Sequence, residues 1–291
     1  MRGAQVAGRE VEHLDAIPGM GAAFARAMVP SRTSRVTLPR RISTVHDVTQ
    51  NRARLADYAR VCGFTLRDAV PPTWLHVLTF PLHIHLLGDP QSSVKLVGAV
   101  HTSNSMTLHR PVTADERLEL SVHLEGPRPH RRGALVDLIG QVRVDGEPVW
   151  DGVTTYLASG ASVEGEPEEV ERAPFEPRSP QARWRLPADL GRQYRRVSQD
   201  PNPIHTSRVA AKAFGFARPI IHGMWTHARA LAALENRLPA AFTTHVDFVK
   251  PILLPSSVGF VASETPGGVL ADVVTKDGAK PLLRMRVEEA A

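Results

Sequence analysis

One short segment of the 291-residue chain brings together side chains that can move protons. Asp200-Pro-Asn-Pro-Ile-His205 places a carboxylate and an imidazole five positions apart. Because its two prolines exclude a regular helix, we predict that the segment is a rigid loop. A carboxylate accepts hydrogen bonds and a histidine exchanges protons near neutral pH. We therefore expect Asp200 and His205 to converge on one water molecule and to activate it.

The same residues also permit a purely structural interpretation. In that interpretation Asp200 or Asn202 bonds to nearby backbone in an Asx turn, and His205 caps the helix expected to follow. The local residue types do not separate the two interpretations, so the rest of the chain has to be compared with this segment.

Gly223 is a second candidate feature, at the expected start of a buried helix over His222 to Leu234. N–H groups at the start of a helix stabilise negative charge, and a glycine lets a ligand carbonyl approach closely. Gly223 would then form an oxyanion hole, with His222 as a further polar group. The alternative is a glycine that only allows close packing beside a packed histidine.

Other kinds of chemistry find little support in the sequence. His83 and His85 have a two-residue spacing that suits a metal on a strand, but no further Cys, His or Asp cluster accompanies them, so no metal is expected. The chain has neither a Gly-rich phosphate loop nor a G-x-S-x-G motif. The single cysteine, Cys62, excludes an internal disulfide and fits a reducing, cytoplasmic compartment.

The amino-acid composition limits the classes of molecule that the protein is expected to bind. The formal net charge is +5, and the densest clusters of Lys and Arg, Arg128 to Arg132 and Arg192 to Arg196, are short. A diffuse positive field of this kind favours small anionic molecules such as phosphorylated carriers. With aromatic residues at only 5% and no basic stripe, we expect no nucleic-acid binding. No apolar run approaches the length of a membrane span.

Periodicity and turn residues indicate the elements that must position these side chains. Alternating apolar and polar residues predict strands around 107–109, 118–120 and 142–144, and another strand is plausible near Ser34 to Leu38. Helices are predicted over 51–60 and over 72–87, where Pro81 should break or kink the second. Residues 20–29 are mildly amphipathic, as in a surface helix or a docking arm.

The two halves of the chain resemble each other. Residues 104–112 match 244–252, the Asp-Gly pairs at 145–146 and 277–278 follow in the same order as hairpin signals, and Tyr58 parallels Tyr194. Tyr58 to Pro72 spans 14 positions (72 − 58), whereas Tyr194 to Pro219 spans 25 (219 − 194). The second half therefore has about 11 extra residues, which include Asp200, Asn202 and His205, while Phe64 takes the place of Asp200 in the first. A loop needed only for folding would be expected twice, so the asymmetry favours chemistry.

Each half is predicted to combine a helix with antiparallel strands, an α+β pattern. A buried helix wrapped by a curved sheet is the simplest way to bury an all-apolar helix in a small domain. We predict an N-terminal arm (1–35), a first domain (36–161), a linker rich in Glu, Pro and Ser (162–182) and a second domain (183–291).

The stretch Tyr194-Arg-Arg-Val-Ser-Gln-Asp-Pro-Asn-Pro-Ile-His205, continuing through Ala211 and Phe214-Gly215 to Arg218-Pro-Ile-Ile-His-Gly-Met224, resembles the hydratase-2 motif of the MaoC-like family. The resemblance covers roughly residues 35–291 and extends to double-hot-dog members with a degenerate first half. It implies two antiparallel sheets, each wrapped around a buried central helix. A departure from the family pattern is Ser207, where many members carry an acidic residue.

The resemblance also implies roles for individual residues. Asp200 and His205 would be catalytic, and the N–H of Gly223 would form the oxyanion hole. Asn202 would brace the loop, and Tyr194 would pack beneath it.

The implied reaction is the reversible hydration of trans-2-enoyl thioesters to (R)-3-hydroxyacyl thioesters, in fatty-acid metabolism and without metal or redox cofactor. The substrate would be carried as an acyl-CoA or acyl carrier protein thioester, by a monomer of two hot-dog units or a homodimer. Two alternatives remain, an acyl-CoA thioesterase and a non-catalytic acyl-thioester-binding protein. The loop argues against the first, and the degenerate first half motivates the second.

Overall fold

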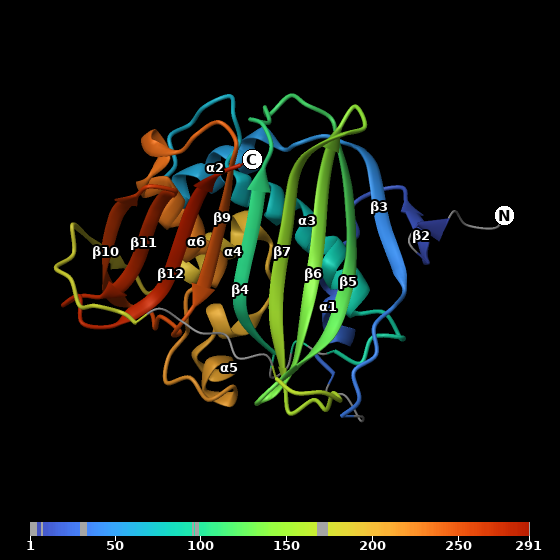
Figure 1. Cartoon of the computed structure of the whole chain (residues 1–291). Helices are drawn as coiled ribbons and strands as arrows, with labels where there is room; N and C mark the ends of the chain where they lie inside the picture. The colour runs from blue at the N-terminus through green and yellow to red at the C-terminus, as the bar shows by residue number, and fades with distance from the viewer. Residues whose placement is uncertain are drawn as a thin grey trace. The chain divides into compact units, whose positions relative to one another are not determined.

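The computed structural model describes residues 5–6, 8–29, 34–94, 96, 99–167 and 174–290. The chain folds into two compact units (Figure 1). The first contains Met1–Gln50, Leu75–Met106 and Val112–Glu171, and the second contains Asn51–Trp74, Thr107–Pro111 and Arg172–Ala291.

The first unit is built on a sheet with one central helix. Its strands β3, β5, β6 and β7 pair antiparallel, and β2 extends the sheet by pairing in parallel with β3, an exception to the antiparallel prediction. The strands are β1 (Gln5–Val6), β2 (Arg9–Leu14), β3 (Arg41–Val48), β4 (Ala99–Leu108), β5 (Leu118–His130), β6 (Gly133–Val144) and β7 (Glu147–Ser159), with helix α1 (Met20–Ala27) after β2.

Helix α3 (Pro72–Leu87) is the buried helix predicted from its apolar sequence. It lies against β6, where His83 donates from Nε2 to the carbonyl of Ile139 at 3.0 Å. Pro81 lies inside the helix and does not break it. A proline removes one N–H from the helix, and the burial of Leu78 and Leu82 around it offsets that loss.

The second unit repeats this plan. Helix α6 (Gly223–Ala233) packs against two strands, β11 and β12, of an antiparallel sheet. The strands are β8 (Ala182–Leu186), β9 (Phe242–Phe248), β10 (Ser256–Thr265), β11 (Gly268–Thr275) and β12 (Pro281–Glu289). The remaining helices are α2 (Arg52–Cys62), α4 (Leu190–Ser198), α5 (Arg208–Ala213) and the 3₁₀ turns η1 (Pro203–His205) and η2 (Glu235–Arg237). Helix α2 precedes α3 in the chain but packs against α4 and α6.

Strand order confirms the internal repeat. In both repeats the third strand lies beside the first, followed by the fourth, the fifth and the second: β3-β5-β6-β7-β4 and β8-β10-β11-β12-β9. Asp145 and Gly146 form a tight turn between β6 and β7 with φ values of 51° and 81°, as a hairpin requires. Asp277 and Gly278 lie in a longer loop between β11 and β12.

Several expectations about the N-terminal region need correction. The strand predicted near Ser34 to Leu38 is wrong, because β3 begins at Arg41, and Arg35 forms only an isolated bridge with Ser162. Within the predicted arm, β2 and α1 belong to the first unit. The arm's residues 1–4, 7 and 30–33 lie outside the described residues, as do 168–173 of the predicted linker. In the described ranges no helix is long and apolar enough to cross a membrane.

Candidate functional site

The loop that carries Asp200 begins at the end of helix α4. This helix is strongly amphipathic, with Tyr194 and Val197 buried and its arginines exposed. It ends at Ser198, because Gln199 adopts the left-handed conformation with φ 62° and ψ 11°. The turn at Gln199 places Asp200 at the first position beyond the helix.

Local hydrogen bonds fix the orientation of Asp200. Its N–H donates to Ser198 Oγ at 3.3 Å, and its Oδ1 accepts the N–H of Asn202 at 2.9 Å. Asn202 repeats the pattern by accepting the N–H of Ile204 at 3.3 Å, which braces the loop as expected. The Asx turns of the structural interpretation are therefore present, and they leave Oδ2 of Asp200 without a partner in the loop.

The predicted loop is correct from Gln199 to Asn202, after which η1 forms a single 3₁₀ turn ending at His205. His205 does not cap the next helix. Ser207 caps α5 instead, accepting the N–H of Ala210 at 3.2 Å. A serine can perform this capping role as well as an acidic residue, so the departure at Ser207 leaves the loop intact.

A backbone carbonyl holds the buried imidazole of His205. Nδ1 lies 2.8 Å from the carbonyl oxygen of Ile220. Because a carbonyl oxygen can only accept, Nδ1 must carry the proton, and Nε2 of the neutral ring keeps its lone pair. Ile220 is fixed by its bridge to Leu253 and donates its own N–H to Ile204 at 3.3 Å.

Gly191, which the sequence did not single out, makes this placement possible. A Cβ atom at Gly191 would collide with the carbonyl oxygen of His205. The first turn of α4 therefore packs directly on the end of η1. Its only signal in the sequence is a glycine three residues before Tyr194, and a glycine alone does not reveal what approaches it.

The ring of His222 completes a compact cluster. It stacks on His205 with ring centroids 3.6 Å apart and planes 25° apart, and Tyr194 packs on it at 4.8 Å. Its Nε2 lies 3.8 Å from Oδ2 of Asp200, which is too long for a hydrogen bond and suits a bridging water. Among the described residues, neither ring nitrogen of His222 has a hydrogen-bond partner.

Burial decides the protonation of these rings. It lowers the pKa of His205, against the opposing influences of the Asp200 carboxylate and the Ile220 carbonyl. Burial, the neighbouring His205 and Arg195 together hold the pKa of His222 well below its usual value. Burial also raises the pKa of Tyr194 well above 10. Both histidines are therefore neutral near pH 7.

Gly223 is the first residue of α6, as predicted, with His222 at the N-cap. A Cβ atom at Gly223 would lie 2.9–3.1 Å from the ring of Phe248. Close packing of Phe248 is thus sufficient to require glycine here. The backbone N–H at this first helical position has no partner within the helix, which leaves it able to bind an anionic oxygen.

Asp200, His205 and His222 also form the group of potential metal ligands found among the described residues, with ligand atoms within 4.8 Å of one another. The lone pairs of imidazole nitrogens lie in the ring planes, so two stacked rings do not direct them at one tetrahedral ion. His83 and His85 lie on helix α3 rather than on a strand, and they bond separately to Ile139 and Glu12.

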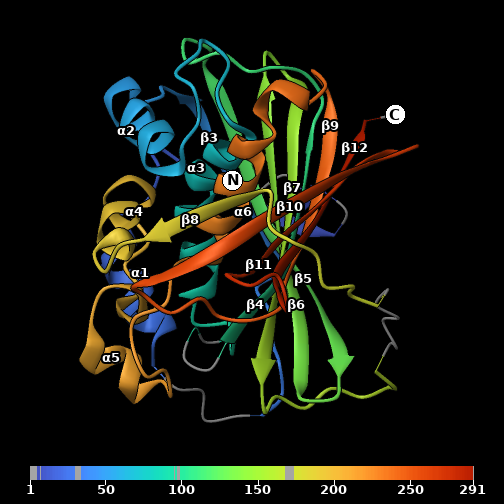
Figure 2. The ribbon, with the colours of Figure 1, turned by 90° about the vertical axis from the view of Figure 1, so that its left-hand side faces the viewer.

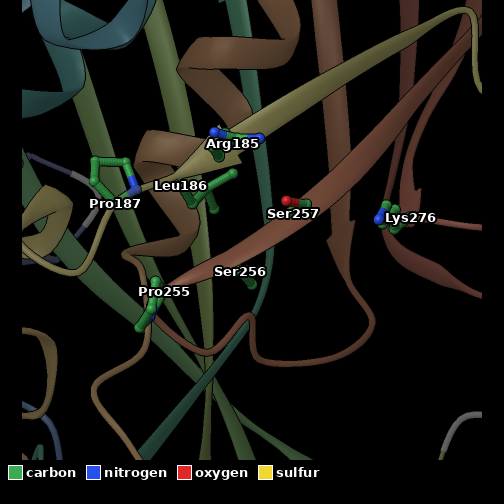
Figure 3. Close-up of a pocket in the computed structure, with 7 residues that line it drawn as sticks. All are labelled: Arg185, Leu186, Pro187, Pro255, Ser256, Ser257 and Lys276. Carbon is green, nitrogen blue, oxygen red and sulfur yellow. The ribbon is translucent and has the colours of Figure 1, made fainter.

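A hollow of about 750 Å³ lies beside strands β8 and β10, and none of the predicted site residues lines it. Figure 3 shows Arg185 and Lys276 on its rim, with Ser257 between them. Its lining residues are Arg185, Leu186, Pro187, Pro255, Ser256, Ser257 and Lys276. None of them carries a carboxylate or an imidazole, so the hollow offers positive charge rather than acid–base chemistry.

Comparison with known proteins gives this arrangement a context. A family model described as MaoC like domain matches residues 167–280. The 3-hydroxyacyl-thioester dehydratase X of Mycobacterium tuberculosis is 39% identical over 248 residues, which are 85% of this chain and 88% of the relative.

Solved structures also match the fold of this chain. A crystal structure of HtdX from M. tuberculosis matches with a TM-score of 0.77 at 35% identity, covering 86% of this chain and 100% of that chain. Another M. tuberculosis protein, described as a double hot-dog fold, matches with a TM-score of 0.52 at 13% identity, covering 94% of this chain and 99% of that chain, and supports the fold alone. The predicted α+β double hot-dog fold is confirmed, and the chain belongs to the MaoC-like family.

Proposed function

We propose that this chain is a hydro-lyase that interconverts (R)-3-hydroxyacyl thioesters and trans-2-enoyl thioesters in fatty-acid metabolism. The name of the M. tuberculosis relative supports the reaction class. The observation that carries the proposal is the tautomer of His205, which leaves a lone pair on Nε2 in a ring that clusters with the Asp200 carboxylate. The loop occurs once in a chain built from two repeats, so we propose one active site per chain.

In the hydration direction, His205 acts as the proton carrier. A water molecule held by Asp200 Oδ2 and His205 Nε2 gives one proton to Nε2 as its oxygen bonds to C3. The C2=C3 electron pair moves toward the thioester carbonyl, and the imidazolium then delivers its proton to C2. Addition is syn, because one loop serves both carbons from one side. Neutral His205 accepts the first proton, and the Asp200 carboxylate stabilises the resulting imidazolium.

We assign polarisation of the thioester carbonyl to the N–H of Gly223 at the start of α6. His222 supports the site as a neutral ring stacked on His205, and Tyr194 packs against His222. We propose that the reaction needs no metal or redox cofactor, since each proton transfer has a donor and an acceptor within the cluster. We also propose a cytoplasmic location, on the basis of the composition.

The direct test is addition of the purified protein to crotonyl-CoA, followed by the loss of enoyl-thioester absorbance and chiral analysis of the product. We expect (R)-3-hydroxybutyryl-CoA. A thiol reagent in a parallel reaction reports thioester hydrolysis, and free thiol without loss of the enoyl group would replace the proposal with a thioesterase. Tight binding without turnover across a series of chain lengths would instead indicate a non-catalytic acyl-binding protein.

A further inference from the structure

Positive charge is concentrated in one stretch of the chain. Residues 183–218, which run from β8 through α5, contain eight Lys or Arg and two Asp or Glu. Outside this stretch there remain 27 of the 35 basic and 28 of the 30 acidic residues. The matching stretch of the first repeat, residues 41–71, has five basic and three acidic residues. The basic excess therefore accompanies the loop of Asp200, as the 11 extra residues do.

Helices α4 and α5 display much of this charge, and they lie one below the other on the same side of the second unit (Figure 2). Arg192, Arg195 and Arg196 form the exposed face of α4, and Arg208 and Lys212 are exposed on α5. We call these five residues and Val209 the basic face. Within the described residues, none of the five cations has an ion-pair partner within 4 Å, although Asp189 interacts electrostatically with Arg192 and Arg196.

Helix stability does not account for these positions. Arg195 and Arg196 lie in the last turn of α4, where the helix dipole favours cations. Arg192 lies in the first turn of α4 and Arg208 begins α5, where the dipole disfavours them. Arg192 and Arg196 are also like charges four residues apart, which destabilises a helix. On α2, the matching helix of the first repeat, Arg60 is neutralised by Asp57 at 2.6 Å.

The basic face also includes one exposed apolar side chain. Val209 is 80% exposed, between Arg208 and Lys212 on α5. Protein–protein interfaces combine an apolar contact with a polar, charged rim, whereas a small anion needs no exposed valine on a convex helix. The hollow with Arg185 and Lys276 adjoins this face, because Pro187 lines it and accepts the N–H of Leu190, the first residue of α4.

From these features we infer that the basic face docks an acidic carrier protein that presents the acyl thioester on a phosphopantetheine arm. The inference rests on the proposed function and names the carrier that the reaction uses. Docking on α4 sets the carrier beside the helix whose end positions Asp200, so the arm has a short path to the loop. A long-range positive field around the entrance raises the rate of encounter with an acidic partner.

The test compares one acyl group on two carriers. Initial rates are measured with crotonyl-loaded acyl carrier protein and with crotonyl-CoA, for the wild type, the double variant Arg192→Glu/Arg196→Glu and the matched control Arg60→Glu on α2. Arg195 is left in place because it influences His222. We expect the double variant to lose about tenfold or more in kcat/KM with the carrier protein, less than twofold with crotonyl-CoA, and the control to change neither. Salt should weaken only the carrier reaction.

Two further measurements keep failure of docking separate from failure of the proposed function. Binding of holo acyl carrier protein is measured directly, so it reports docking even if the wild type turns over neither thioester. Val209→Ser/Lys212→Glu repeats the test on α5, in case the first variant misfolds. Equal losses on both thioesters, unchanged carrier affinity, or binding of short double-stranded DNA but not of the carrier would each overturn the inference.

Discussion

The ends of helices α2 and α4 show how one backbone device serves two different purposes. Both helices end with a left-handed residue, Gly63 with φ 83° and Gln199 with φ 62°. The next residue is Phe64 in the first repeat, where it is buried as core, and Asp200 in the second, where it is part of the polar cluster. The fold requires the turn at this place, but not the carboxylate.

The equivalent residues even contact each other. The rings of Tyr58 and Tyr194 lie 6.1 Å apart where α2 packs against α4. Beyond Phe64, the first repeat continues directly to α3, whereas the second inserts η1 and α5 before α6. Because the first repeat folds without the insertion, the residues of 199–218 are not needed to form a sheet around a helix. We infer from this difference that the insertion carries the proposed function, and substitutions can test this inference.

The largest expected effect comes from the proton carrier. His205→Asn keeps an N–H near the position of Nδ1 for the Ile220 carbonyl but removes Nε2. We expect kcat for crotonyl-CoA to fall about 10³-fold, because general acid–base groups contribute about 10²- to 10⁴-fold. The melting temperature should change little. Activity within tenfold of the wild type would remove His205 from the chemistry.

The second-largest expected effect comes from substitutions at the residues that follow α4 and α2, Asp200 and Phe64. Asp200→Asn retains an oxygen for the N–H of Asn202 and removes the charge, so kcat should fall about 10²- to 10³-fold. Phe64→Asp places a carboxylate at the equivalent position of the first repeat, where no histidine loop follows. We expect it to cost stability by burying a charge and to give no activity to the Asp200→Asn background. Rescue in the double variant would show that the two ends are interchangeable.

A third substitution tests the packing that places His205. Gly191→Ala forces α4 away from the carbonyl of His205, so we expect a loss of about 1–3 kcal/mol in unfolding free energy and roughly 10²-fold in kcat. Gly21→Ala in α1 is the matched control, since nothing lies within 4 Å of its added Cβ. The control should gain about 0.4–1 kcal/mol and keep full activity. Equal stability of the two variants, by urea denaturation, would contradict the contact.

The pH dependence of hydration reports the protonation state of His205. No equivalent histidine follows Phe64 in the first repeat. Burial lowers its pKa below 6.5, so the neutral base predominates at pH 7. Hydration should be at its plateau there and fall about tenfold per pH unit below the folded pKa. The stability contribution has the same sign: as the pH falls below 6.5, the unfolded chain binds a proton that the folded one resists, so stability declines. A midpoint above 6.5 in kcat/KM would contradict this assignment.

We expect the smallest effect on kcat when the last residues of helices α2 and α4 are exchanged. Ser198, whose Oγ accepts the N–H of Asp200, occupies the position of Cys62 in α2. Ser198→Cys replaces a hydroxyl acceptor with a weak sulfur one, at a cost of about 1 kcal/mol, or roughly fivefold in kcat. Cys62→Ser should leave kcat unchanged. A larger loss from Cys62→Ser than from Ser198→Cys would reverse the proposed roles of the two repeats.

The repeat, its helices and the proposed proton-transfer pair were readable from the sequence because each has a local cause. Long apolar runs predicted α3 and α6, Asp-Gly pairs marked both hairpins, and the extra residues after Tyr194 pointed to the loop. The predictions that failed involved long-range partners. A strand was predicted near Ser34 to Leu38, but the strand forms at Arg41–Val48, where β2 and β5 are its hydrogen-bonding partners. Pro81 did not end α3, because burial outweighed its local cost.

The sequence by itself determined which residues can react, since prolines stiffen the loop and a carboxylate and an imidazole follow at fixed spacing. Only the tertiary structure decided how they are prepared. The Ile220 carbonyl sets the tautomer of His205, Gly191 admits its backbone, and His222 stacks on its ring. These partners lie far from His205 along the chain, and hydrogen-bond direction, steric contact and burial act through space, so no local pattern could reveal them.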